Sequence, residues 1–157
     1  MSVAQLKKIR SQRVERIYIE LQRLKSSFRQ AEIELQQARD EFENYSLWRE
    51  REERSLFNSL QQSDSFSANT IKNYNLKVES LKLNESQLNN AIPAFEKNLD
   101  ATKKVLEKVQ EKLQIANKDM EKVDEFIDIQ KVEDKLIEEA QEENVADELS
   151  CFKSSQK

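Results

Sequence analysis

The sequence has no glycine, no histidine and a single proline, Pro93, among its 157 residues. Without glycine, backbone conformations with positive φ are costly, which excludes most tight turns, strand bulges and glycine-built phosphate loops. We therefore expect a chain that reverses its direction only once or twice.

The lack of histidine also narrows the chemistry that the chain can perform. Its single cysteine, Cys151, can form no disulfide within the chain, and no zinc site or Cys–His nucleophile can be assembled around it. The carboxylates and hydroxyls that remain would stand on an exposed surface, where nothing excludes water or shifts a pKa. We expect no enzymatic activity, no cofactor and no metal site.

Long apolar runs are missing as well. Spanning a bilayer takes about 18 or more predominantly apolar residues, and the positively charged start is not followed by the apolar segment of a signal peptide. We expect a cytoplasmic protein without direct membrane insertion.

What the sequence does contain is charge and periodic apolar residues. Hydrophobic residues make up 37% of the chain and charged residues 36%, which suits an apolar stripe better than a globular core. From Val14 the apolar residues recur in alternating steps of three and four, a heptad seam typical of a coiled coil. The positions of this first seam are all apolar: Val14, Ile17, Leu21, Leu24, Phe28, Ala31, Leu35, Ala38, Phe42 and Tyr45.

A second heptad seam runs from Ile71 to Gln130 and is apolar at every position except Glu85, Thr102 and Gln130. Two seams joined by a short connection must pair antiparallel, each burying the stripe of the other. The predicted fold is therefore all-α, an antiparallel coiled-coil hairpin over residues 1–140. We expect helices at about 5–61 and 68–138, a loop at about 62–67 and an acidic, frayed or disordered tail at 141–157.

Several local features refine this hairpin. Ser67 is a good N-cap for the second helix, with Phe66 and Ile71 as a hydrophobic staple. If Leu60 lies near Ile71, Leu35 falls opposite Phe95 and Tyr45 opposite Glu85. Pro93 removes one helical hydrogen bond and predicts a local kink, either structural or a functional hinge.

The segment after Tyr45 breaks the heptad rule. Continuing the heptad count turns Leu47, Trp48 and Phe57 away from the seam and places Arg49 and Glu52 in it. Exposed aromatic residues beside arginine are typical of protein interfaces. The alternative is a stutter after Tyr45 that buries Trp48 and Leu60.

The N-terminal 29 residues are strongly basic, with eight lysines and arginines against Glu15 and Glu20, whereas the whole chain has a net charge of −4. Neutralisation by the neighbouring acidic end of the hairpin is the simplest interpretation. An acidic protein partner is a second, and nucleic acid the least favoured because no base-reading motif accompanies the charge.

Residues 45–57 resemble the YscO family of type III secretion proteins, relatives of the flagellar protein FliJ. The resemblance rests on Tyr45, Leu47, Trp48, Arg49, Glu52, Glu53, Leu56 and Phe57. Arg13-Val14-Glu15-Arg16, the length and the hairpin pattern are also similar to that family.

This resemblance implies a cytoplasmic stalk, peripheral at the inner membrane, that links the hexameric export ATPase to the cytoplasmic domain of the export-gate membrane protein and assists in handling substrates or chaperones. It implies that residues 45–57 contact the gate. It also implies that the end bearing both termini enters the ATPase ring, where the candidate contacts are Lys7, Lys8, Arg10, Arg13 and Arg16.

Two other functions fit the same pattern. A generic chaperone-like or tethering hairpin would act without an ATPase, through apolar side chains at its tip. A purely structural coiled coil would dimerise through outward-facing aliphatic residues, whereas the stalk is expected to be a monomer when isolated.

Overall fold

The computed structural model describes residues 2–63 and 67–155, and these form two helices, α1 (Val3–Gln62) and α2 (Ala68–Ser155). No strand occurs in these two ranges, so the all-α prediction is confirmed. By its internal contacts the chain divides into two units, Leu21–Lys108 and a second unit made of Met1–Glu20 with Val109–Lys157.

Helix α1 begins two residues earlier than expected because Ser2 caps it. The Ser2 hydroxyl accepts from the amide of Gln5 at 3.2 Å, and the Gln5 side chain accepts from the amide of Ser2 at 3.0 Å. These reciprocal bonds form a capping box, which satisfies two backbone amides that the helix leaves without a partner.

The predicted N-cap of α2 is confirmed. The hydroxyl of Ser67 accepts from the amide of Thr70 at 3.1 Å and lies 2.7 Å from the Thr70 hydroxyl. The predicted staple involves Phe66, which lies outside the described residues. The cap defines where the second helix begins, within one residue of the expected position.

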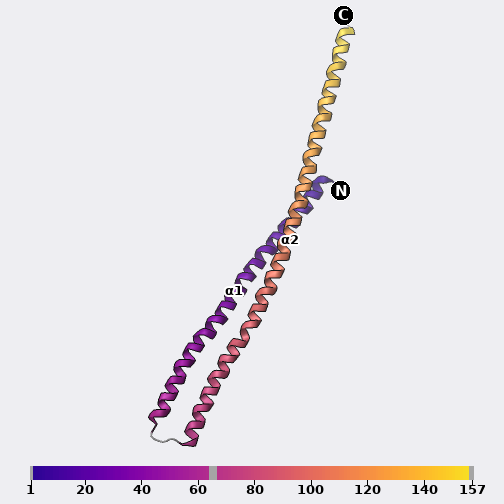
Figure 1. Cartoon of the computed structure of the whole chain (residues 1–157). Coiled ribbons are helices and arrows are strands. Elements are labelled where there is room, and N and C mark those ends of the chain that lie inside the picture. Colours follow the sequence, from indigo (N-terminus) through magenta and orange to yellow (C-terminus); the bar gives the residue numbers. More distant parts are fainter. Residues whose placement is uncertain (1, 64–66, 156–157) are drawn as a thin grey trace. The chain divides into compact units, whose positions relative to one another are not determined.

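In the unit Leu21–Lys108 the two helices run beside each other from the connection between them (Figure 1). Leu21, Ala31 and Leu35 are buried on α1, and the α2 seam positions from Tyr74 to Leu106 are half-buried. Arg39 and Glu96 form an ion pair across the helices at 3.6 Å. The expected alignment of Leu35 with Phe95 would place Arg39 opposite Ala91, so this pair departs from that register by five residues, a little more than one turn.

In the other unit, residues 3–20 of α1 pack against the part of α2 that follows Val109. Ile17 is buried on α1, and Val109, Ala116 and Val123 are buried on α2 at seam positions. The three buried α2 residues are seven residues, or two helical turns, apart, which is the heptad spacing of a coiled-coil seam and leaves the outer face of the helix in solvent.

Helix α2 continues past the expected boundary near residue 138 and ends at Ser155. The segment contains neither glycine nor proline to stop it, and its many Glu, Gln, Ala and Leu residues favour helix. In the same unit it extends beyond the start of α1, as the yellow end of the ribbon in Figure 1 shows. The predicted fraying of residues 141–157 concerns motion in solution and stays a prediction.

Pro93 lies inside α2, which is helical on both sides of it. Its ring is exposed, whereas its neighbour Ile92 is half-buried in the seam. The proline therefore occupies a position where it removes a backbone hydrogen bond without opening the packed face.

Neither helix, over its described residues, contains a stretch that is both long and apolar enough to cross a membrane.

Candidate interaction surface on α1

Tyr45 marks the end of the apolar part of the first seam. Its ring is half-buried, and its hydroxyl donates to the carbonyl of Leu81 on α2 at 3.1 Å. Its ring centre lies 5.4 Å from that of Trp48, with the planes tilted by 49°. The tyrosine thus joins the packed seam to the exposed tryptophan and orients the indole.

One turn later the seam carries charge. Arg49 pairs with Glu53 on its own helix at 2.9 Å, and its Nε donates to Glu85 on α2. The side chain of Arg49 is only 16% exposed, and those of Glu53 and Glu85 are 26% and 24% exposed. A guanidinium held between two carboxylates is well satisfied, because its donors lie in a fixed fork that matches carboxylate oxygens.

The pKa of Arg49 reflects this environment. Burial alone lowers it, but hydrogen bonds to Glu85 and Glu53 and the charges of both carboxylates outweigh the burial, so the pKa of Arg49 is raised above its ordinary value. The arginine therefore stays charged across the neutral pH range.

The expected position of these charges is largely correct. Arg49, Glu52, Glu53 and Leu56 are all half-buried on the seam side of α1. Glu85 lies opposite Arg49, one turn away from the position opposite Tyr45 that the residue count predicts. The charged stretch of α1 therefore meets the one acidic position of the α2 seam.

The large apolar side chains of the same segment point outward. Leu47, Trp48 and Phe57 are 48%, 47% and 47% exposed. The stutter that would bury Trp48 does not occur, although Leu60 is half-buried as that alternative also required. The heptad continues through Arg49, and the apolar surface that this creates faces solvent.

Phe57 does not join Leu47 and Trp48 in one patch. Nine residues separate it from Trp48, which on a helix of 3.6 residues per turn is two and a half turns, so the two rings leave α1 on opposite sides. Phe57 instead approaches Tyr74 of α2, with ring centres 6.5 Å apart. We therefore define the α1 patch as Leu47 and Trp48, with Tyr45 behind them.

The basic N-terminal residues divide into two groups. Lys7 pairs with Asp124 at 3.2 Å, and Arg10 pairs with Asp119 at 3.6 Å and donates to the Asp119 carbonyl. Lys8, Arg13 and Arg16 are exposed on α1. Part of the basic charge is thus neutralised within the hairpin, by α2 residues that precede the acidic tail.

The network of Arg49, Glu53 and Glu85 was not predicted from the sequence as a unit. The signal was present, because Arg49 and Glu85 are each a charged residue at a seam position. Recognising the pair required the register between the helices to be known to within one turn.

Both the sequence and the fold of this chain are similar to known proteins. Residues 3–151 match the family described as type III secretion protein YscO. The chain is also similar to the 2.8 Å crystal structure of the type III secretion protein YscO from Vibrio parahaemolyticus, with a TM-score of 0.78 and 22% identity over 93% of this chain and 91% of that one. A comparison with curated protein sequences gives no match. Since the family match spans nearly the whole chain, the protein belongs to the YscO family of type III secretion proteins.

Proposed function

We propose that the protein is the stalk that links the hexameric export ATPase of a type III secretion system to the cytoplasmic domain of the export-gate membrane protein, and that it assists in handling substrates or chaperones. It would work in the cytoplasm, at the inner face of the membrane, by binding and not by catalysis. The observation that carries the proposal is the α1 patch, where Leu47 and Trp48 are about half exposed beside a charged seam.

The α1 patch has the chemistry of a protein contact. A tryptophan buries a large area in a partner at little cost in conformational entropy, and aromatic anchors carry much of the energy of protein interfaces. The Tyr45 ring, tilted against the indole, and its hydroxyl bond to the carbonyl of Leu81 tie the site to α2. We assign the gate to this patch.

The ATPase would meet the basic start of α1. Lys8, Arg13 and Arg16 are exposed, whereas Lys7 and Arg10 already pair with α2. We therefore keep only Lys8, Arg13 and Arg16 as candidate contacts with the ATPase ring. Contacts of exposed charges steer association and weaken as salt is added.

The test measures binding of the full chain to the purified ATPase and to the gate domain of the same secretion system. The variant Leu47→Ala with Trp48→Ala is expected to bind the gate about tenfold or more weakly and the ATPase as well as the wild type. The matched control, Leu76→Ala with Leu83→Ala, changes two leucines of α2 that are similarly exposed and should change neither affinity. Circular dichroism verifies that each variant is helical.

A second variant separates the two partners. Reversing Lys8, Arg13 and Arg16 to glutamate should weaken ATPase binding, most strongly at low salt, and leave the gate affinity unchanged. If the wild type binds neither partner at low or moderate salt, the stalk proposal fails. A generic tethering or chaperone-like hairpin then becomes the better interpretation.

A further inference from the structure

The C-terminal part of α2 carries an apolar stripe that the hairpin leaves uncovered. Phe126, Ile129, Val132, Leu136 and Ile137 are each between 53% and 60% exposed. Their spacing in steps of three and four, with Ile137 beside Leu136, places them on one side of the helix. We call these five residues the tail stripe.

Ile129, Val132 and Leu136 of the tail stripe lie on the side of α2 that faces away from α1, and Phe126 and Ile137 lie at one edge of that side, about 80–100° around the helix from the seam. Ile127 is half-buried in the seam, and Ile129, two residues later, is turned about 200° around the helix axis. The stripe starts where the hairpin interface ends, since Phe126 lines a groove with Val3, Leu6 and Val123. A partner on the stripe can therefore bind while α1 stays in place.

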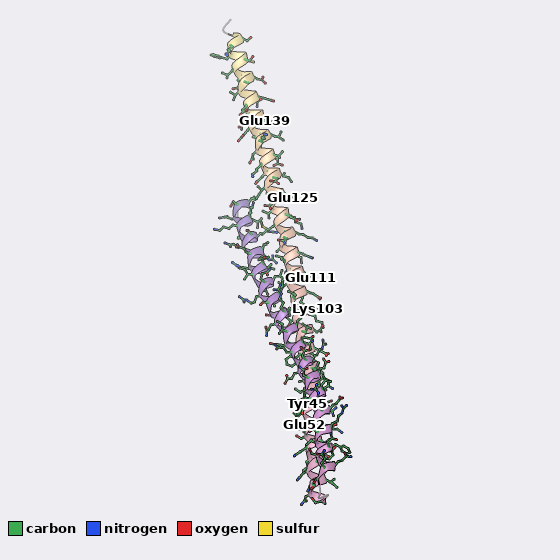
Figure 2. All side chains as sticks on the ribbon, turned by 90° about the vertical axis from the view of Figure 1, so that its left-hand side faces the viewer. Tyr45, Glu52, Lys103, Glu111, Glu125 and Glu139 are labelled. Atoms are coloured by element: carbon green, nitrogen blue, oxygen red, sulfur yellow. The ribbon has the colours of Figure 1, made fainter. Side chains whose placement is uncertain are left out.

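Acidic residues flank the tail stripe. Residues 128–155 carry nine Asp or Glu and three Lys, and every one of these residues is exposed. Glu125, Glu133, Glu139 and Glu143 lie on or beside the stripe by their spacing, whereas Lys131 and Lys135 turn away from it. Figure 2 shows Glu125 near the start of α1 and Glu139 on the part of α2 beyond it.

We propose that the tail stripe is the docking surface for a basic amphipathic α-helix of a partner protein. An apolar stripe about three turns long fits the apolar face of one helix, and the acidic flanks fit lysines and arginines at its edges. The added helix would continue the coiled-coil packing of α1 and α2 onto the outer side of α2.

A second copy of this chain is a poorer occupant. Two tail stripes packed together would bring their acidic flanks into contact, and like charges across a coiled coil oppose pairing. The basic segment of α1 is not a suitable partner helix either, because its apolar residues Val14 and Ile17 are turned to α2, with Ile17 buried.

Docking would also stabilise the tail. An isolated helix in water is only marginally stable, and residues 128–155 gain nothing from packing because all of them are exposed. Binding a basic helix should therefore slow amide exchange in this segment. The inference is independent of the stalk proposal, which uses residues of α1.

The test uses the full chain labelled with a fluorophore at Cys151, which is exposed. The probe is a synthetic amphipathic peptide of about 20 residues with leucines in heptad spacing and lysines at the flanks, compared with the same peptide carrying glutamate for lysine. We expect the lysine peptide to bind one to one, at least about tenfold more tightly than the glutamate peptide. Residues 126–140 should then exchange their amides more slowly.

The matched variants change the same residue types on opposite sides of the segment. Val132→Ala with Leu136→Ala removes part of the tail stripe, and Val145→Ala with Leu149→Ala removes valine and leucine from the other side. The first pair should weaken peptide binding about tenfold, the second less than twofold. Both pairs raise helix propensity equally, so a loss of fold does not explain a difference.

Two results would overturn the inference. Equal weakening by both pairs would mean that the peptide is held by acidic charge alone and that the stripe is not a site. A dimer of the wild-type chain that forms with rising concentration, and that Val132→Ala with Leu136→Ala abolishes, would mean that a second copy covers the stripe.

Discussion

Arg49 is the first charged residue in the α1 seam after an apolar run from Val14 to Tyr45. Taking its guanidinium out of water has a cost, and the two carboxylates offset that cost only while all three groups are present. The cluster therefore contributes more to the alignment of the helices than to their stability, because a shift by one turn would leave Arg49 beside apolar residues.

Single and double substitutions in this cluster should have opposite effects on stability. Arg49→Ala should lower the free energy of unfolding by roughly 2 kcal/mol, since Glu85 is then left partly buried without its partner. Arg49→Leu combined with Glu85→Leu should be neutral or stabilising, because it completes an apolar seam. Urea unfolding followed by circular dichroism measures both.

Lys104→Ala provides the control, because its pair with Asp100 is exposed and is expected to contribute little. If the double leucine variant loses as much stability as Arg49→Ala, the cluster contributes mainly to stability and not to the alignment of the helices.

At the scale of the helices, the sequence predicted most of what the structure contains. The heptad count identified Ile17, Ala31, Leu35, Val109, Ala116 and Val123 as seam residues, and each is buried. The count succeeds because the seam follows directly from apolar residues that recur every 3.5 positions on average, and this spacing can be read from the sequence. It also turned Leu47, Trp48 and Phe57 outward correctly.

Two features could not be predicted in this way. The end of α2 was placed near residue 138 because the apolar seam stops there, but a helix rich in Glu and Ala continues to Ser155 without a seam. The separation of Phe57 from Trp48 depends on the angle between the two side chains around the helix axis. Classifying both residues only as outward-facing does not give that angle. The loss of a seam is therefore a poor marker of where a helix ends.

Pro93 provides a test of how α2 tolerates an interior proline. Pro93→Ala restores a donor for the carbonyl of Asn89 and removes the contact between that carbonyl and the ring, so the free energy of unfolding should rise by about 1–3 kcal/mol. Thermal unfolding followed by circular dichroism measures the gain. Lys97→Ala, at an exposed position one turn away, should change the midpoint little.

An unchanged thermal unfolding midpoint in Pro93→Ala would mean that the helix around the proline has already adjusted to the missing hydrogen bond, so that the proline costs no stability. A gain in stability with a loss of partner binding would instead favour the interpretation of Pro93 as a functional hinge.

At the scale of the whole chain, α2 extends well beyond the last residues that pack against α1. Residues 128–155 are helical but exposed throughout, so removing residues 131–157 should leave the free energy of unfolding in urea within about 0.5 kcal/mol of the wild type while lowering the helical signal. A truncation after Ile115 is the matched comparison. It removes the buried Ala116 and Val123 and should destabilise the protein clearly.

Hydrogen exchange gives an independent check on the same segment. Amides of residues 131–155 should exchange faster than those of residues 109–123 in the isolated protein. Equal protection of the two segments would show that the tail packs against something in solution, and would contradict the predicted fraying.

The cross-helix contacts also determine the order in which the chain can fold. Tyr45 and Leu81 are 36 residues apart in the sequence, whereas Arg10 and Asp119 are 109 residues apart. The entropy lost on closing a loop grows with its length, so pairs close to the reversal of the chain form at the lowest cost, and each pair shortens the loop that the next one must close. Folding should therefore proceed as a zipper that starts near the reversal, with the basic N-terminal turns of α1 the last to dock and the first to detach.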